Sequence, residues 1–189
     1  MHKNNKITIR ELTLMSVAVS LNVVGAFIAL NLRLPIYMDS IGTILIASLL
    51  GPKYAVITGV CGSLVSGMTF DPYSFYFAPT QISTGFFAAM MYKKGMLEGK
   101  KTLLGTLIFA IPTATISAIV TAYLFGGITS SGSSYIVQIL NVYNVPLVVS
   151  VFLTQLATDY SDKLLAVIIS SVVVKTMPSN IRLKLKAQN

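Results

Sequence analysis

The fold is decided by residues 31–53, which read NLRLPIYMDSIGTILIASLLGPK. An apolar run from Ile36 to Leu50 ends at Gly51-Pro52, and a second apolar run extends from Tyr54 to Met68. Each run has about 15 residues and would reach about 22 Å as a helix, which is less than the roughly 30 Å of a bilayer's hydrocarbon core. We therefore predict two short membrane helices, with a cavity above their outer ends.

The composition of the whole chain favours lipid as its main solvent. The chain has 189 residues, 54% hydrophobic and 11% charged, with a mean hydropathy of +0.75. Soluble domains average about 25% charged residues, so this composition excludes disorder, a coiled coil and a collagen-like chain. The net charge of +8 would suggest a nucleic-acid partner in a soluble protein. In a membrane protein it indicates topology bias instead, and we expect no nucleic-acid partner.

The reactive side chains are few. The chain has one histidine, His2, one cysteine, Cys61, and no tryptophan. An internal disulfide is impossible, and neither a thiolate or imidazole metal site nor a Ser-His-Asp or Cys-His catalytic arrangement is expected. We predict no catalytic residue, no metal site and no cofactor, which leaves binding or transport rather than an enzyme.

Six apolar stretches are predicted to span the membrane. The expected fold class is an all-α integral membrane protein of one domain, with an outward-facing ligand pocket capped by loops. The first stretch is too long for a cleaved signal peptide, so we expect it to stay in the mature protein. The predicted spans cover residues 12–32, 36–50, 54–68, 75–92, 102–125 and 160–177.

The basic residues choose between six spans and seven. If residues 135–156 do not cross, 12 of the 14 basic residues lie with both termini on the cytoplasmic side, and only Arg33 and Lys163 lie outside. A seventh crossing would place the basic C-terminal tail outside. We therefore predict that residues 126–159 form an outer loop that folds back over the pocket. Whether 135–156 is re-entrant, interfacial or a further span stays open.

Arg33 is the strongest candidate for ligand contact, with Tyr37 and Asp39 close to it in the sequence. The guanidinium group could hold a carboxylate or phosphate by two hydrogen bonds. Alternatively, Arg33 reaches the headgroups or pairs with Asp39. Asp39 has the chemistry of an N-cap for the second helix, which we consider alongside substrate contact.

An aromatic loop and a set of amides complete the candidate site. Residues 70–77 hold five aromatic side chains, including Tyr73 and Tyr76, which form either an interfacial belt or a lid that stacks on a ligand. Neutral donors and acceptors come from four amides, which could also bond to other helices. A polar and mostly uncharged cavity would suit a small hydroxylated or amide-bearing metabolite. The four amides are Gln81, Gln138, Asn141 and Asn144.

The chain resembles the substrate-binding S components of energy-coupling factor (ECF) vitamin transporters. The resemblance rests on the six-span layout, LPIYMDSIGT at 34–43 leading to LGP at 50–52, the small-residue third span, and DKLLAV at 162–167. It implies a vitamin bound near the outer face of a bacterial cell membrane, under the loops after spans one, three and five. It also implies a membrane coupling subunit and two ATPase subunits as partners, and delivery by toppling of the whole S component within the bilayer.

The resemblance also implies a docking face of small residues on the first helix. The matching pairs are Ser16 with Ser20 and Gly25 with Ala29, whereas Ala18 faces Asn22 instead of a second alanine.

Among family members the chain is most similar to the pantothenate-specific type. Arg33 beside Asn and Tyr groups suits a small carboxylate that carries hydroxyls and an amide. Pyridoxine or a thiamine-precursor pyrimidine is the alternative ligand, for which the aromatic loop would stack and Asp39 or Asp71 would matter more. Two other classes stay open: a structural membrane subunit without a ligand, and a small membrane enzyme. The enzyme is disfavoured because all six acids are expected in tails, loops or span ends.

Overall fold

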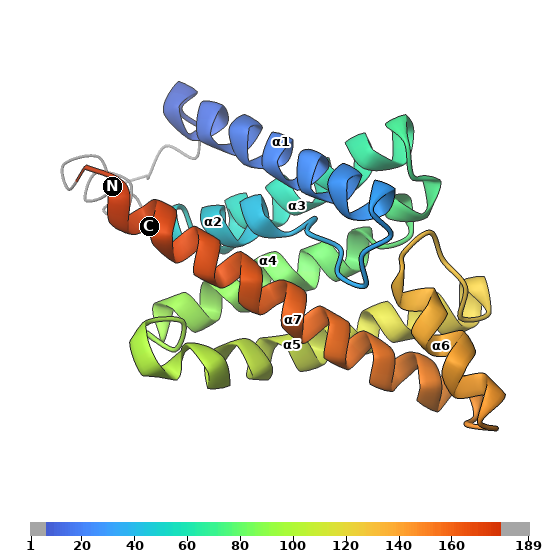
Figure 1. The fold of residues 1–189 in the computed structure, drawn as a ribbon. Coiled ribbons are helices and arrows are strands. Elements are labelled where there is room, and N and C mark those ends of the chain that lie inside the picture. The colour runs from blue at the N-terminus through green and yellow to red at the C-terminus, as the bar shows by residue number, and fades with distance from the viewer. Residues whose placement is uncertain (1–6, 179–189) are drawn as a thin grey trace.

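A computed structural model describes residues 7–178, and within this range the chain is all-helical (Figure 1). Short 3-10 turns at Pro72–Phe75 and Gly99–Lys101 precede α4 and α5, and a π-helical turn at Val120–Leu124 extends α5. The seven α-helices are α1 (Ile9–Asn31), α2 (Ile41–Leu49), α3 (Pro52–Thr69), α4 (Ala78–Lys93), α5 (Thr102–Ile119), α6 (Ser133–Val142) and α7 (Leu147–Thr176).

Local sequence signals set several helix ends. The Thr8 hydroxyl accepts a hydrogen bond from the Glu11 N–H at 3.3 Å, and the Glu11 carboxylate accepts one from the Thr8 N–H at 2.7 Å. This reciprocal capping box starts α1. Gly51 adopts φ 84°, a left-handed conformation that favours glycine, and Pro52 occupies the first turn of α3. The chain therefore turns sharply between α2 and α3.

The helix boundaries differ from the predicted ranges at several places. Residues 36–40 are not helical, and α2 begins at Ile41; α4 begins at Ala78, after the separate turn at Pro72–Phe75. The largest difference is α7, which begins at Leu147 rather than near residue 160. Part of the predicted outer loop 126–159 is therefore helical. Pro146 lies at the start of α7 and does not interrupt a helix, and the polar residues that follow it face the protein interior.

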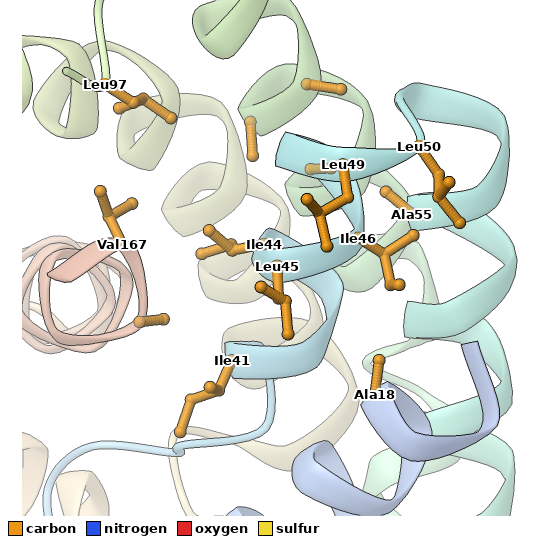
Figure 2. Close-up of a cluster of buried hydrophobic side chains, with 14 of the residues drawn as sticks. Ala18, Ile41, Ile44, Leu45, Ile46, Leu49, Leu50, Ala55, Leu97 and Val167 are labelled. Atoms are coloured by element: carbon orange, nitrogen blue, oxygen red, sulfur yellow. The ribbon is translucent and has the colours of Figure 1, made fainter. Parts of the chain in front are cut away.

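The short helix α2 forms the centre of the core. Ile44, Ile46 and Leu49 are each at most 1% exposed, and α2 packs against α1, α3, α4 and α7. Figure 2 shows these side chains between Val167 of α7 and Ala18 of α1. The approach to α1 is so close that a Cβ atom at Gly42 would collide with the Ala18 carbonyl. Small residues thus allow backbone contact between these two helices.

The two ends of the molecule differ. The start of α1, the turn between α4 and α5 and the end of α7 lie at one end, while α6 lies at the other (Figure 1). Two helical stretches, Ile9–Asn31 and Gly99–Leu124, are long and apolar enough to cross a membrane by length and composition alone. The loops that enclose a buried polar region lie at the end that contains α6.

Candidate ligand-binding site

A buried ion-pair cluster lies in the middle of α7. The Lys163 ammonium group is 3.1 Å from an Asp159 carboxylate oxygen and 3.1 Å from an Asp162 carboxylate oxygen, and all three side chains are at most 2% exposed. The Thr113 hydroxyl of α5 donates a further hydrogen bond to Asp159. Buried charges are tolerated when they are paired and hydrogen-bonded, as here, but two carboxylates surround a single ammonium group.

Asp162 fixes the loop that joins α1 to α2. Its carboxylate accepts hydrogen bonds from the Met38 N–H at 2.6 Å and from the Ser40 hydroxyl at 3.0 Å. Met38 has φ 53°, a conformation that is uncommon for a residue with a side chain and is held here by the contact to α7. Asp39 lies between these two anchored residues, so Asp162 determines where the Asp39 carboxylate can point.

Asn22 of α1 satisfies the first turn of α2. Its side-chain oxygen accepts hydrogen bonds from the Gly42 N–H at 2.7 Å and the Thr43 N–H at 3.3 Å. The prediction that Asp39 caps α2 is therefore wrong: the N-cap position is Ser40, without a side-chain cap hydrogen bond, and Asn22 supplies the acceptor from another helix. The Asn22 amide also donates to Thr43 Oγ1 at 2.8 Å, and this hydroxyl donates to Gln81 Oε1 at 3.1 Å.

Tyr37 ties the same loop to the opposite wall of the site. Its hydroxyl donates to Gln155 Oε1 at 3.1 Å and lies 3.2 Å from the Ser133 hydroxyl. Gln155 also accepts from the Ser117 hydroxyl at 3.1 Å and donates to Thr121 Oγ1 at 3.0 Å. The π-helical turn that contains Thr121 thus contributes to the polar network, as such turns often do near functional sites.

Two small cavities lie inside this polar region. Each has a volume of about 40 Å³, and both are lined by Tyr37, Asp39, Asp71, Ser74 and Ser130. The deeper cavity also reaches Thr80, Gln81, Ser117, Asp159 and Lys163. A volume of this size holds water but no metabolite, because ligand pockets usually measure roughly 300–1,000 Å³. A ligand of that size does not fit either cavity in this conformation.

Two polar atoms at these cavities are buried and lack hydrogen-bond partners among residues 7–178. They are Oδ1 of Asp71 and Oγ1 of Thr80. The second carboxylate oxygen of Asp71 accepts from the Ser74 hydroxyl at 3.0 Å, so only one face of this group is satisfied. A buried oxygen without a partner is costly. A hydrogen-bond donor placed in the cavity, from water or a ligand, would remove that cost.

Aromatic side chains of residues 73–77 pack against Phe125. The Phe125 ring, which follows the π-helical turn, lies 4.8 Å from Tyr73, 5.3 Å from Tyr76 and 6.2 Å from Phe77 between ring centroids. Tyr73 and Tyr76 pack edge-on against Phe125, a favourable geometry for aromatic pairs. These contacts hold residues 72–77 against the chain after α5, and Phe77 also lines the deeper cavity.

A family model described as "ECF transporter, substrate-specific component" matches residues 10–178. The chain belongs to this family. Its members are membrane proteins that bind a small-molecule substrate for a transporter and associate with the subunits of an ECF module. Neither the curated proteins nor the solved structures contain a match to this chain.

The S component brings only some of its predicted site residues together. Tyr37, Asp39 and Gln81 line the deeper cavity, whereas Tyr73 and Tyr76 line neither inner cavity and pack against Phe125.

Arg33 lies elsewhere and does not pair with Asp39. Its guanidinium group donates to the Tyr135 hydroxyl at 2.5 Å in a neighbouring recess of about 400 Å³, which Gln138 also lines. Asn141 and Asn144 are exposed at the end of α6 and line none of these cavities; Asn144, with φ 61°, lies in the turn after that helix.

The predicted docking residues on α1 also divide into two groups. Ser16 and Ser20 are exposed, with their hydroxyls bonded to carbonyls of their own helix. Gly25 and Ala29 are buried, and a Cβ atom at Gly25 would collide with the Met38 carbonyl. In this conformation the second pair faces the loop that carries Asp39 rather than a partner subunit.

The residues missed by sequence reasoning are those of α7. The sequence predicts the acids in loops, tails or span ends, with residues 162 and 163 at the start of the last span, whereas Asp159, Asp162 and Lys163 are buried inside a helix of 30 residues. The i, i+4 spacing of Asp159 and Lys163 would have revealed an ion pair, but only for a helix that begins before residue 159. Among residues 7–178, no group of three His, Cys, Asp or Glu side chains could hold a metal ion.

Proposed function

We propose that this S component binds a small ring-shaped vitamin that carries hydrogen-bond donors, of the pyridoxine or thiamine-precursor pyrimidine class. The ligand would occupy the region of the two inner cavities after the covering loops open. The observation that carries the proposal is the Asp71 carboxylate, which has one buried oxygen without a partner at the cavity wall. Asp39 and Asp159 line the same cavity, so acidic groups outnumber the single Lys163 ammonium group.

The excess of acidic groups around the cavity favours ligands with hydrogen-bond donors over anionic ligands. The Lys163 ammonium group already lies between two carboxylates at 3.1 Å, so it offers little to a ligand carboxylate. An anion placed beside Asp39, Asp71 and Asp159 would be repelled, whereas ring N–H and hydroxyl donors would be attracted. The rings of Tyr73, Tyr76 and Phe77 supply apolar surface for a flat ligand once they separate from Phe125.

Pantothenate is the second candidate, favoured by the position of Arg33. The recess at Arg33 adjoins the inner cavities, because Leu30, Ser130 and Ser131 line both the recess and one cavity. A ligand with its carboxylate on Arg33 and its hydroxyls pointing inward would span this path. Its affinity would then depend on Arg33 more than on Asp71.

We also propose the arrangement of the S component in the membrane. The six spans correspond to α1, α2, α3, α4, α5 and α7, and α6 lies at the outer face as part of the cover. The lysines between α4 and α5 lie at the same end as the start of α1 and the end of α7, which supports a cytoplasmic location for that end (Figure 1). The coupling subunit and two ATPases would then drive delivery by toppling in a bacterial cell membrane.

The test is ligand titration into purified S component in detergent. Pyridoxine, the thiamine-precursor pyrimidine and pantothenate are titrated into wild type, Asp71→Asn, Arg33→Ala and the exposed control Asn141→Ala. One of the two ring compounds should bind, and Asp71→Asn should weaken it by roughly 10- to 100-fold, the value of a charge-assisted hydrogen bond. Pantothenate binding that is lost in Arg33→Ala would select the second candidate. Failure of every compound to bind folded protein would favour a structural subunit.

A further inference from the structure

A further cavity lies away from the ligand site, beside the second half of α7. Its volume is about 560 Å³, which is within the roughly 300–1,000 Å³ usual for ligand pockets. It is bounded by the end of α2, the turn between α4 and α5 and the last turns of α7. This is the end of the molecule where α1 starts and α7 stops (Figure 1).

The walls of this cavity are largely aliphatic. Leu97 lies deep inside at 1% exposed, while Leu103 of α5 and Ile168 of α7 are 59% and 50% exposed beside the opening. Leu164 and Val174 of α7 complete the apolar lining. Because α5 and α7 belong to a membrane protein, exposed aliphatic side chains on them face hydrocarbon. The opening between the two helices therefore leads toward lipid tails rather than toward water.

The polar groups of the cavity are hydroxyls and one cation. Ser48, Ser171 and Tyr92 line it, and the Tyr92 hydroxyl is buried without a hydrogen-bond partner in the described part of the chain. Lys175, in the last turn of α7, supplies a positive charge that enters no ion pair among residues 7–178. Glu98 is the one acid in the lining.

The charge around the opening is positive in sum. The lining itself holds one cation, Lys175, and one acid, Glu98; the exposed Lys100 and Lys101 lie between the lining residues Gly99 and Thr102 and add two positive charges beside the cavity. A phosphate group near these lysines would be attracted, and an acyl chain attached to it would cover the aliphatic walls. A soluble anion would leave those walls uncovered.

We propose that this cavity binds one anionic phospholipid of the inner leaflet. One acyl chain lies between α5 and α7 against Leu97 and Ile168, and the phosphate lies near Lys175. The Tyr92 and Ser171 hydroxyls hydrogen-bond to the ester or glycerol oxygens. This site is separate from the vitamin cavity and does not depend on which vitamin binds.

The test is native mass spectrometry of the full-length protein in detergent. Phosphatidylglycerol and phosphatidylcholine with identical acyl chains are added separately, and glycerol phosphate serves as the soluble phosphate source. One phosphatidylglycerol should be retained in preference to phosphatidylcholine. Lys175→Gln should lower that occupancy about fivefold, the effect of one lysine near an anionic lipid. The control Lys53→Gln removes an exposed lysine outside the cavity and should change nothing.

A second variant tests the apolar part. Ser171→Leu fills the cavity and should abolish retention of both lipids. If the Ser171→Leu protein does not fold, the double variant Tyr92→Phe, Lys175→Gln is used instead. This double variant should lower phosphatidylglycerol occupancy more than Lys175→Gln alone. Equal retention of the two lipids, equal loss in Lys175→Gln and Lys53→Gln, or displacement by glycerol phosphate would each overturn the proposal. Vitamin titration into Lys175→Gln should match wild type, which separates this result from the fate of the proposed ligand.

Discussion

The contact between Asp162 and the loop at Met38–Ser40 leads to the most informative prediction about the site. Replacing Asp162 with asparagine keeps the size of the side chain but removes its charge. In the variant, the remaining side-chain oxygen can still accept from the Met38 N–H. The new NH₂ group, however, replaces the carboxylate oxygen that accepts from both the Ser40 hydroxyl and the Lys163 ammonium group in wild type, so donors face a donor. Lys163 keeps only Asp159 as an ion-pair partner.

The expected cost follows from burial. Lys163 and Asp162 are at most 2% exposed, and breaking a buried ion pair costs roughly 3–5 kcal/mol. For a chain of this size each kcal/mol shifts the melting temperature by about 2–4 °C, so Asp162→Asn should melt roughly 10 °C below wild type. Because the anchor of Asp39 is weakened, ligand affinity should also fall, by roughly tenfold or more.

Hydrogen exchange separates loop release from general instability. Amides of residues 36–40 should exchange faster in Asp162→Asn, while those of α3 should keep wild-type rates at a temperature well below unfolding. Ser161→Ala is the matched control, because Ser161 is exposed on the same helix and bonds only to the Ala157 carbonyl. Wild-type exchange at 36–40 together with wild-type ligand affinity would refute the assigned role of Asp162.

Three further changes test the packing around the site. Asn22→Ala removes the acceptor for the first turn of α2 and the donor to Thr43, so thermal unfolding should show a loss of roughly 1–3 kcal/mol, and an unchanged melting temperature would contradict this. Gly42→Ala places a methyl group against the Ala18 backbone and should lower stability by roughly 1–3 kcal/mol in the same assay, whereas wild-type stability would show that α1 and α2 can separate. Phe125→Ala removes the ring that holds the aromatic cover, so stopped-flow measurements should show roughly tenfold faster ligand release; an unchanged rate would exclude this cover as a barrier to exit.

Several features of the fold were predictable because local signals set them. Apolar runs indicated where helices lie, and Gly51-Pro52 marked the turn between α2 and α3. The tyrosine and aspartate of the motif at residues 34–43 were candidates for the site, and Tyr37 and Asp39 do line its cavity. The family resemblance rested on the same stretch.

The course of α7 was less predictable because its polar residues face inward. Four polar residues of α7 are at most 5% exposed: Thr154, Gln155, Thr158 and Asp159. In the sequence their low hydropathy looks like the end of an apolar helix. Gln155 bonds to Ser117 of α5 and to Tyr37 of the first loop, and Asp159 accepts from Thr113 of α5. These partners are far away in sequence, so only the tertiary structure shows that a helix can accommodate such residues. The outer loop was predicted to extend to residue 159 because these polar residues were interpreted as the end of an apolar segment.

The roles of Asn22 and Arg33 depended on long-range geometry in the same way. Asn22 acts on an N-terminus about 20 residues later, and Arg33 meets Tyr135 across 102 residues. Arg33 and Met38 adopt left-handed conformations, at φ 50° and 53°. These conformations set the side of the α1–α2 loop on which the Arg33 and Asp39 side chains lie. Neither residue type predicts such a conformation, so the separation of Arg33 from Asp39 could not be anticipated.

The most direct test of the proposed function is the identity of the small molecule that copurifies with the S component. Wild type and Asp71→Asn are purified in detergent and denatured, and the released molecules are identified and quantified by mass spectrometry. The proposed site predicts about one molecule of a pyridoxine or pyrimidine compound per wild-type chain and a large loss in Asp71→Asn. An equal amount of such a compound from both proteins, or pantothenate from both, would contradict a donor-rich ligand held by Asp71.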